Sequence, residues 1–176
     1  MLSSEFSTIL TSPLGLLHAR GSFHALTHLT FLASTTAVEE PVAERPLGSQ
    51  PRWFSLLQEQ LSAYFSGELS TFTVPLALNG TSFQKKVWQK LLDIPHGQTR
   101  SYQELAIQVG GATYTRAVGL ANSLNPVAIL VPCHRVIGAD GELRGYAGGV
   151  ERKQQLLQME GVALPATRQL QLSLPF

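Results

Sequence analysis

The sequence predicts an α+β fold, with a small antiparallel sheet and one helix in residues 1–80 and a mostly helical part in residues 81–176. Short alternating segments between turn residues come first, and amphipathic stretches with helix-capping residues follow. The 176 residues, 44% of them hydrophobic, suffice for a packed core and exclude a disordered chain. No apolar run approaches the roughly 20 residues of a membrane-spanning helix, and the start lacks the pattern of a signal peptide.

The N-terminal part begins with three predicted strands. Residues 7–10, 14–20 and 26–32 are β-prone segments separated by turn sequences, which predicts two hairpins. The polar stretch over 34–50 predicts a surface loop.

A helix and an extended segment complete this part. Apolar side chains recur at three- and four-residue steps from Trp53 to Phe65, and Gly67 ends the predicted helix. Residues 69–80 are predicted to be extended, with a turn at Asn79 and Gly80. We therefore place the domain boundary at residue 80.

The C-terminal part is predicted to contain four helices. Capping residues mark the starts of three, and these are Thr81 or Ser82, then Ser101 with Glu104 as a capping box, then Thr113. Pro95 and Gly97 stop the first helix. The second and third, joined by a glycine turn, form a helix-turn-helix pattern, which helix pairs packed in cores share. The fourth covers 150–159, with Gly161 just beyond its end.

The predicted helix over 114–123 has an unusual composition. Arg116 stands among small residues, and Gly119 costs about 1 kcal/mol relative to alanine, so close approach of another backbone would explain it. That backbone could be protein, in a packed core, or nucleic acid. The net charge of +1 divides into −3 for residues 1–80 and +4 for residues 81–176. This asymmetry hints at an anionic partner, although ordinary variation in surface charge gives the same numbers.

The single cysteine, Cys133, excludes an internal disulfide and a multi-cysteine metal site, and it favours a reducing compartment such as the cytosol. A lone cysteine is most often a small buried side chain. However, residues 127–131 predict a buried strand that ends at Pro132, directly before the cysteine. His134 and Arg135 follow, and positive neighbours are expected to lower the thiol pKa from about 8.5 toward neutrality. Side chains of adjacent extended residues point apart, so a water or a turn is needed to couple His134 to the thiol.

The segment PCHRV at 132–136 resembles the active-site motif of the O6-alkylguanine-DNA alkyltransferases, also called methylated-DNA–protein-cysteine methyltransferases. Further blocks in the same order resemble that family, and they are residues 83–88, 94–97, 101–102, 116–119, 125–126, 145–149 and 160–161. Residues 1–80 match only in general shape. The resemblance implies a ribonuclease H-like N-terminal domain and a winged-helix-like C-terminal domain. It implies the stand-alone bacterial-type form, with no cofactor and no metal.

The resemblance also implies a catalytic set. Cys133 would attack the alkyl carbon on O6 of guanine, and His134 would take its proton through a water. Glu160 would hold the other imidazole nitrogen, Tyr102 would protonate the departing oxygen, and Asn125 would brace the chain near the cysteine. The thioether product is stable, so each molecule would act once.

The implied partner is double-stranded DNA with alkylated bases, and the damaged base must be flipped out of the stack. Arg116 would fill the vacated place while its helix lies in the minor groove. The other residues expected at the DNA are Thr115, Ala117, Gly119, Ala121 and Arg135. Those expected to line the base pocket are Val136, Tyr146, Ala147 and Gly148, with main-chain groups of Cys133 and Val136 reaching the guanine edge.

Two departures from the family bear on substrate range. Ala128 and Ala147 stand where some members have a proline and a serine, which puts bulky benzyl-type substrates in doubt but not methyl transfer. O4-alkylthymine remains a second potential substrate. A non-catalytic lesion-binding protein and a cysteine hydrolase are the alternatives. Relatives of the first kind carry tryptophan in place of the cysteine, and the second lacks a distant-histidine motif. We expect a cytoplasmic monomer with no membrane partner.

Overall fold

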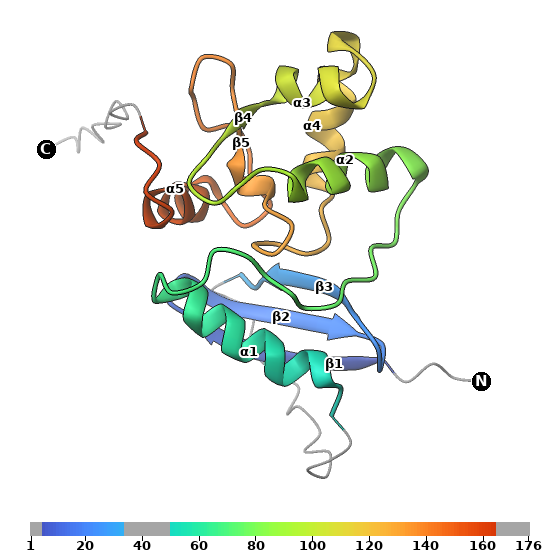
Figure 1. The fold of residues 1–176 in the computed structure, drawn as a ribbon, viewed down its shortest axis with the longest axis vertical. Coiled ribbons are helices and arrows are strands. Elements are labelled where there is room, and N and C mark those ends of the chain that lie inside the picture. Colours follow the sequence, from blue (N-terminus) through green and yellow to red (C-terminus); the bar gives the residue numbers. More distant parts are fainter. Residues whose placement is uncertain (1–4, 34–49, 165–176) are drawn as a thin grey trace, which may run out of the picture.

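The structure, a computed structural model, describes residues 5–33 and 50–164. All but the last residue of the predicted loop over 34–50 lies outside the described residues. The described chain forms two lobes, a sheet with one helix and a group of helices, with the segment between α1 and α2 running from one to the other (Figure 1).

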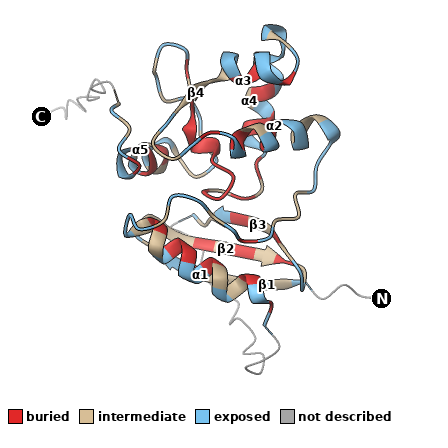
Figure 2. Ribbon diagram, viewed as in Figure 1, coloured by how far each residue is buried: buried red, intermediate tan, exposed pale blue. Residues whose placement is uncertain are grey.

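Three strands build the first lobe, as the sequence predicts. They are β1 (Phe6–Ser12), β2 (Gly15–Gly21) and β3 (Leu26–Phe31), antiparallel and in the order β1-β2-β3. Helix α1 (Arg52–Phe65) covers one face of the sheet with its buried side, and the indole of Trp53 donates to the carbonyl of Ser22 at 2.7 Å (Figure 2). The alternating strand pattern and the helical repeat therefore bury a common apolar layer.

Four helices build the second lobe. They are α2 (Ser82–Leu92), α3 (Tyr102–Val109), α4 (Thr115–Ser123) and α5 (Val150–Met159). Two short strands, β4 (Arg100–Ser101) and β5 (Val136–Ile137), pair in parallel between them. The capping box at Ser101 is confirmed, and Thr81 forms another with Gln84. The predicted cap at Thr113 is wrong, because Ala112–Tyr114 form a short 3₁₀ helix, η1, and α4 starts without a side-chain cap.

The prediction of a strand over 127–131 is wrong. Only Val127 makes a bridge, to Leu29 of β3, and the chain then turns through Ile129, which has a φ of 71°. A β-branched residue is strained at positive φ, and such strain is typical of functional sites. The composition of this segment is that of a strand, but apart from the bond between Ala128 and Leu29, the Asn125 side chain binds the backbone of Val127 and Val131 locally.

The outer edge of β3 joins the lobes. Leu26 exchanges backbone hydrogen bonds with Pro75 and Ala77, and Leu29 does so with Pro126 and Ala128 at 2.8 Å each. The sheet therefore holds the turn that leads to Cys133.

Candidate active site

Cys133 begins a short 3₁₀ helix, η2 (Cys133–Arg135), and is 4% exposed. The amide of Asn125 donates to its Sγ at 3.0 Å. Burial raises the pKa of the Cys133 thiol, and the Asn125 hydrogen bond and the charge of Lys153 offset this in part. The expected lowering of the pKa by His134 and Arg135 is therefore wrong, because desolvation outweighs the favourable neighbours and Arg135 is paired with a carboxylate.

Asn125 ties the thiol to the turn that precedes it. Its Nδ2 also donates to the carbonyls of Val131 at 2.8 Å and Val127 at 3.2 Å, while its Oδ1 accepts from the Val127 amide at 3.1 Å. One side chain thus fixes both the backbone course and the sulfur atom.

His134 and Glu160 form a buried pair from distant parts of the chain. His134 Nε2 lies 2.9 Å from Glu160 Oε1, and both side chains are 0% exposed. Burial lowers the pKa of His134, while Glu160 acts in the opposite direction. His134 Nδ1 has no hydrogen-bond partner among the described residues, so this nitrogen is the one left for proton transfer. The 3₁₀ turn replaces the extended geometry considered from the sequence.

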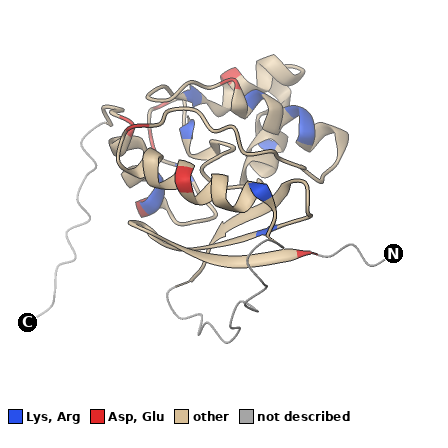
Figure 3. Cartoon of the chain, turned by 60° about the horizontal axis from the view of Figure 1, so that its bottom comes forward, with Lys and Arg blue, Asp and Glu red and all other residues tan. Residues whose placement is uncertain are grey.

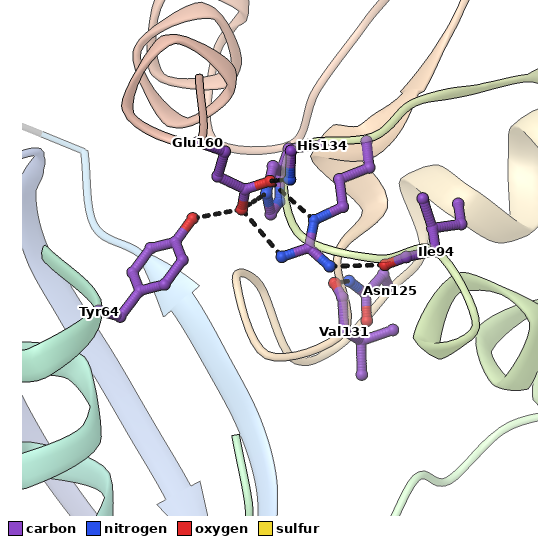
Figure 4. Close-up of polar contacts among 8 residues, drawn as sticks. Tyr64, Ile94, Asn125, Val131, His134 and Glu160 are labelled. Carbon is purple, nitrogen blue, oxygen red and sulfur yellow. Dashed lines mark hydrogen bonds and ion pairs between the residues drawn. The ribbon is translucent and has the colours of Figure 1, made fainter. Parts of the chain in front are cut away.

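The Glu160 carboxylate accepts from four residues in three segments, namely α1, the loop after α2, and η2, and Figure 4 shows its contacts with Tyr64 and His134. Arg135 Nε donates to Oε2 at 2.8 Å and Arg135 Nη2 to Oε1 at 2.9 Å. The Tyr64 hydroxyl donates to Oε1 at 2.6 Å, and the Gly97 amide to Oε2 at 3.3 Å. Burial alone would raise the pKa of Glu160, but the hydrogen bonds from His134 and Arg135 hold it well below its usual range.

The expectation that Arg135 binds DNA does not fit its position. Its side chain is buried, and besides Glu160 it donates to the carbonyl of Ile94 at 2.6 Å. Its charge is committed inside the lobe, so we assign it a structural role.

A groove of about 360 Å³ opens between α3, α4 and the chain after β5. It is lined by Tyr102, Gln103, Thr115, Arg116, Gly119, Gly138, Ala139 and Arg144. This volume falls in the range of small-molecule sites. Burial raises the pKa of Tyr102, which lines this groove, and a charge on Cys133 would raise it further.

The sequence of α4 left open whether its small residues pack in a protein core or lie against nucleic acid, and the exposure of its side chains separates the two. Arg116 and Ala117 are exposed, and Arg116 has no ion-pair partner among the described residues. A methyl group at Gly119 would meet only the Tyr102 ring, at 3.9 Å, so core packing does not require this glycine. Ala121 is buried and its carbonyl accepts from Trp88 at 2.8 Å, so the expectation that it faces DNA is wrong. Thr115 donates to the Ala112 carbonyl at 2.7 Å.

The expected pocket residues lie on two segments. Val136 is buried, with its N–H bonded to Cys133 and its carbonyl accepting from Lys153, so neither group is free of protein partners. Tyr146 packs its ring on Phe31 at 6.5 Å, and its buried hydroxyl has no partner among the described residues. A methyl group at Gly148 would lie 2.7 Å from the Phe31 ring, and Ala147 is exposed.

Two residues of the site were not identified from the sequence. Lys153 is fully buried and its Nζ donates to the carbonyls of Val136 at 2.6 Å and Arg144 at 2.8 Å. Burial lowers its pKa to about 8. The signal was present, because Lys153, Leu156, Leu157 and Glu160 recur at the spacing of one helical face. Tyr64 gave no signal, since its position in α1 predicts only core packing.

The described residues hold no group of three or more side chains arranged to bind a metal ion. None of the helices among them is both long and apolar enough to cross a membrane.

Two family models match the chain. The 6-O-methylguanine DNA methyltransferase ribonuclease-like domain matches residues 6–78, and the DNA binding domain of the same family matches residues 82–162. The methylated-DNA–protein-cysteine methyltransferase of Mycobacterium tuberculosis is 51% identical, over 88% of this chain and 92% of its own length. That of Methanosarcina barkeri is 46% identical, over 86% and 94%.

Solved structures agree with these matches. The crystal structure of M. tuberculosis O6-methylguanine methyltransferase has a TM-score of 0.77 and 46% identity, covering 93% of this chain and 96% of that one. The M. tuberculosis protein in complex with DNA has a TM-score of 0.76 and 48% identity, covering 88% and 92%. By sequence and by fold, the chain belongs to the methylated-DNA–protein-cysteine methyltransferases.

Proposed function

We propose that Cys133 is the residue that receives the alkyl group when this chain repairs DNA. Members of this family are named for methyl transfer from DNA to a protein cysteine, and this chain has one cysteine among its 176 residues. That single observation carries the assignment. The proposed substrate is O6-alkylguanine in duplex DNA, with methyl as the main group transferred and O4-alkylthymine as a second candidate.

The site supports an in-line displacement at the alkyl carbon. The sulfur of Cys133 forms a bond to that carbon as the bond from carbon to O6 breaks, and the electron pair leaves on guanine. His134 Nδ1 takes the thiol proton through a water, because Nε2 is committed to Glu160. This coupling is needed, because burial raises the thiol pKa and so keeps the resting sulfur protonated.

Tyr102 is proposed as the acid that protonates the departing guanine. Its raised pKa keeps the hydroxyl protonated, and it lines the groove from which the base would enter. Guanine gains a proton from Tyr102, and His134 gains the proton that Cys133 loses. The two transfers balance once Tyr102 is reprotonated. The products are normal guanine and a thioether, which no group in the site can hydrolyse, so one molecule repairs one base.

The exposed face of α4 is the proposed minor-groove surface. Arg116 and Ala117 are exposed to solvent, and Thr115 and Gly119 line the protein groove between α3 and α4. Figure 3 marks Lys and Arg positions along the backbone of the helical lobe, and their side chains would face phosphates in this proposal. A base flipped out of the stack would enter the groove while Arg116 occupies its place.

The remaining expectations are part of the same proposal. Residues 1–80 and 81–176 would form the two domains, and Tyr146, Ala147, Gly148 and Val136 would border the bound base. We propose a monomer without cofactor, in the cytoplasm, where a reducing environment keeps the Cys133 thiol free.

The test is to incubate the protein with duplex DNA carrying O6-methylguanine and to weigh the tryptic peptide over residues 117–135, which contains Cys133. We expect the gain of one methylene on Cys133 and one repaired base per protein molecule. Tight binding with an unmodified peptide would indicate a lesion-binding protein, and turnover beyond one equivalent would indicate a hydrolase.

The variant Cys133→Ser should lose transfer completely and keep DNA binding, since the serine hydroxyl is a far weaker nucleophile of nearly the same size. Gel-shift affinity for the damaged duplex checks that binding is intact. A Cys133→Ser protein that still repairs DNA would overturn the assignment.

A further inference from the structure

Tyr64 connects the sheet lobe to the catalytic carboxylate. It lies near the end of α1, is 1% exposed, and its hydroxyl reaches across the lobe interface to Glu160 Oε1 at 2.6 Å. Figure 4 shows its ring extending from the first lobe toward the carboxylate. The two residues are 96 positions apart in sequence, so only the docking of the lobes brings them together.

This hydroxyl shares its acceptor with the catalytic pair. Glu160 Oε1 also accepts from His134 Nε2 and Arg135 Nη2, each at 2.9 Å. Burial and the Glu160 charge raise the pKa of Tyr64, so the hydroxyl remains a donor at every pH at which the protein works. A third donor on one oxygen both fixes its position and withdraws electron density from the bond to His134.

The same lobe also fixes the other side of the cysteine. The backbone of Leu29 binds Pro126 and Ala128, beside the Asn125 side chain that holds Sγ. The sheet lobe therefore touches both the carboxylate behind His134 and the turn behind Cys133.

We propose that Tyr64 is a positioning residue for alkyl transfer, supplied by the sheet lobe, which holds Glu160 Oε1 and thereby sets the orientation and basicity of His134. The inference rests on the proton transfer through His134 and Glu160 given under Proposed function. It adds a residue of the N-terminal lobe to the active site.

The expected effect on His134 has a definite sign. Without the Tyr64 hydroxyl, Glu160 keeps one donor fewer and stabilises the imidazolium more, so the His134 pKa rises. Transfer needs neutral His134, so the acidic limb of the rate profile moves to higher pH. The titratable groups that contact or electrostatically influence the His134–Glu160 pair are Cys133, Arg135, Lys153, Tyr64 and Tyr146, and the ring of His96 packs on Tyr64.

The experiment measures single-turnover transfer from a short O6-methylguanine duplex as a function of pH for three full-length variants. Tyr64→Phe removes only the hydroxyl. Thr73→Val is the matched control, because it removes another hydroxyl that is bonded to α1, through Gln60 at 2.5 Å, with no contact to Glu160. Glu160→Gln removes the charge behind His134. Circular dichroism sets a temperature at which all three are folded.

We expect Tyr64→Phe to move the acidic limb up by about half a unit to one unit and to slow transfer roughly threefold to tenfold. Glu160→Gln should move the limb down, because the imidazolium loses its counter-charge, and Thr73→Val should keep the wild-type profile. If the acidic limb of the pH–rate profile of Tyr64→Phe equals that of wild type and of Thr73→Val, while Glu160→Gln is impaired, the role of Tyr64 is overturned and the proton-transfer scheme stands. Wild-type rates in Glu160→Gln would instead overturn the proton-transfer scheme, and the Tyr64 inference with it.

Discussion

The cluster around Glu160 and the outer face of α4 are built in opposite ways. Glu160 accepts five hydrogen bonds from protein donors, and its side chain is 0% exposed. On α4, Arg116 is exposed without an ion-pair partner among the described residues, and Leu120 is 63% exposed. The charge of Glu160 therefore has its partners within the protein, whereas the side chains on the outer face of α4 remain exposed to solvent.

This difference agrees with the roles proposed for the two regions. A buried charge must be paired, and a group that moves protons gains from fixed neighbours in a site shielded from water. A surface that receives DNA must leave its cations and apolar side chains for the partner to cover. We therefore expect changes in the cluster to affect chemistry and folding together, and changes on α4 to affect duplex DNA alone.

The variant Glu160→Gln provides the largest test of this contrast. It leaves the Arg135 charge buried without its partner and His134 without a fixed tautomer. We expect a loss of about 3–5 kcal/mol of stability from the broken buried pair. Transfer should slow by roughly 10² to 10⁴, as when an acid–base catalyst is disabled. Urea unfolding measures the stability and single-turnover kinetics the rate of transfer. A variant as stable as wild type would contradict a stabilising role for the buried Glu160 pairs.

The variant Arg116→Ala tests the outer face of α4. We expect unchanged folding and transfer from duplex DNA slowed about tenfold to hundredfold, because the flipped state loses the group that fills the stack. A lesion in single-stranded DNA needs no such filling and should be repaired at the wild-type rate. Lys90→Ala is the control for loss of a surface charge, since Lys90 on α2 is paired with Asp93 at 2.8 Å. Equal slowing on both substrates would contradict the assignment of Arg116.

The sequence was sufficient wherever a local pattern decides the structure. The three strands of the N-terminal sheet, the helix caps at Ser101 and Thr81, and the bounds of α5 follow from periodicity and capping residues. The turn through Ile129 could not be predicted, because Asn125 supplies its hydrogen bonds and the composition alone favours a strand.

The parts of the site that depend on lobe packing were also beyond the sequence. The thiol pKa and the position of Arg135 depend on burial, which one residue's neighbours in sequence do not determine. The contact between Tyr64 and Glu160 depends on how two lobes dock.

The test of Lys153, which is buried on α5, concerns pH. Its pKa is lowered from 10.5 to about 8 by burial, so between these values the unfolded chain binds a proton that the folded chain does not. Wild-type stability should therefore gain a contribution as pH rises through this window. In Lys153→Met this pH-dependent contribution is absent. The carbonyls of Val136 and Arg144 also lose their donor, which should lower the free energy of unfolding by about 1–3 kcal/mol. Urea unfolding from pH 7.5 to pH 10.5 compares the two slopes, and parallel curves would contradict a buried, shifted lysine.

The smallest effect is expected at Gly119 on α4. A methyl group there would touch only the Tyr102 ring at 3.9 Å, so Gly119→Ala should stabilise the free protein by up to about 1 kcal/mol through helix propensity. The same methyl group would stand between α4 and a sugar–phosphate backbone, so affinity for duplex DNA should fall a few-fold. Ser123→Ala, at the exposed end of the same helix, is the control for an alanine substitution away from the groove, and it also removes the hydrogen bond from Ser123 to the Leu120 carbonyl. Thermal unfolding and duplex binding should move in opposite directions for Gly119→Ala. If both improve, Gly119 is required by neither the core nor the DNA, and it does not belong to the part of α4 that contacts DNA.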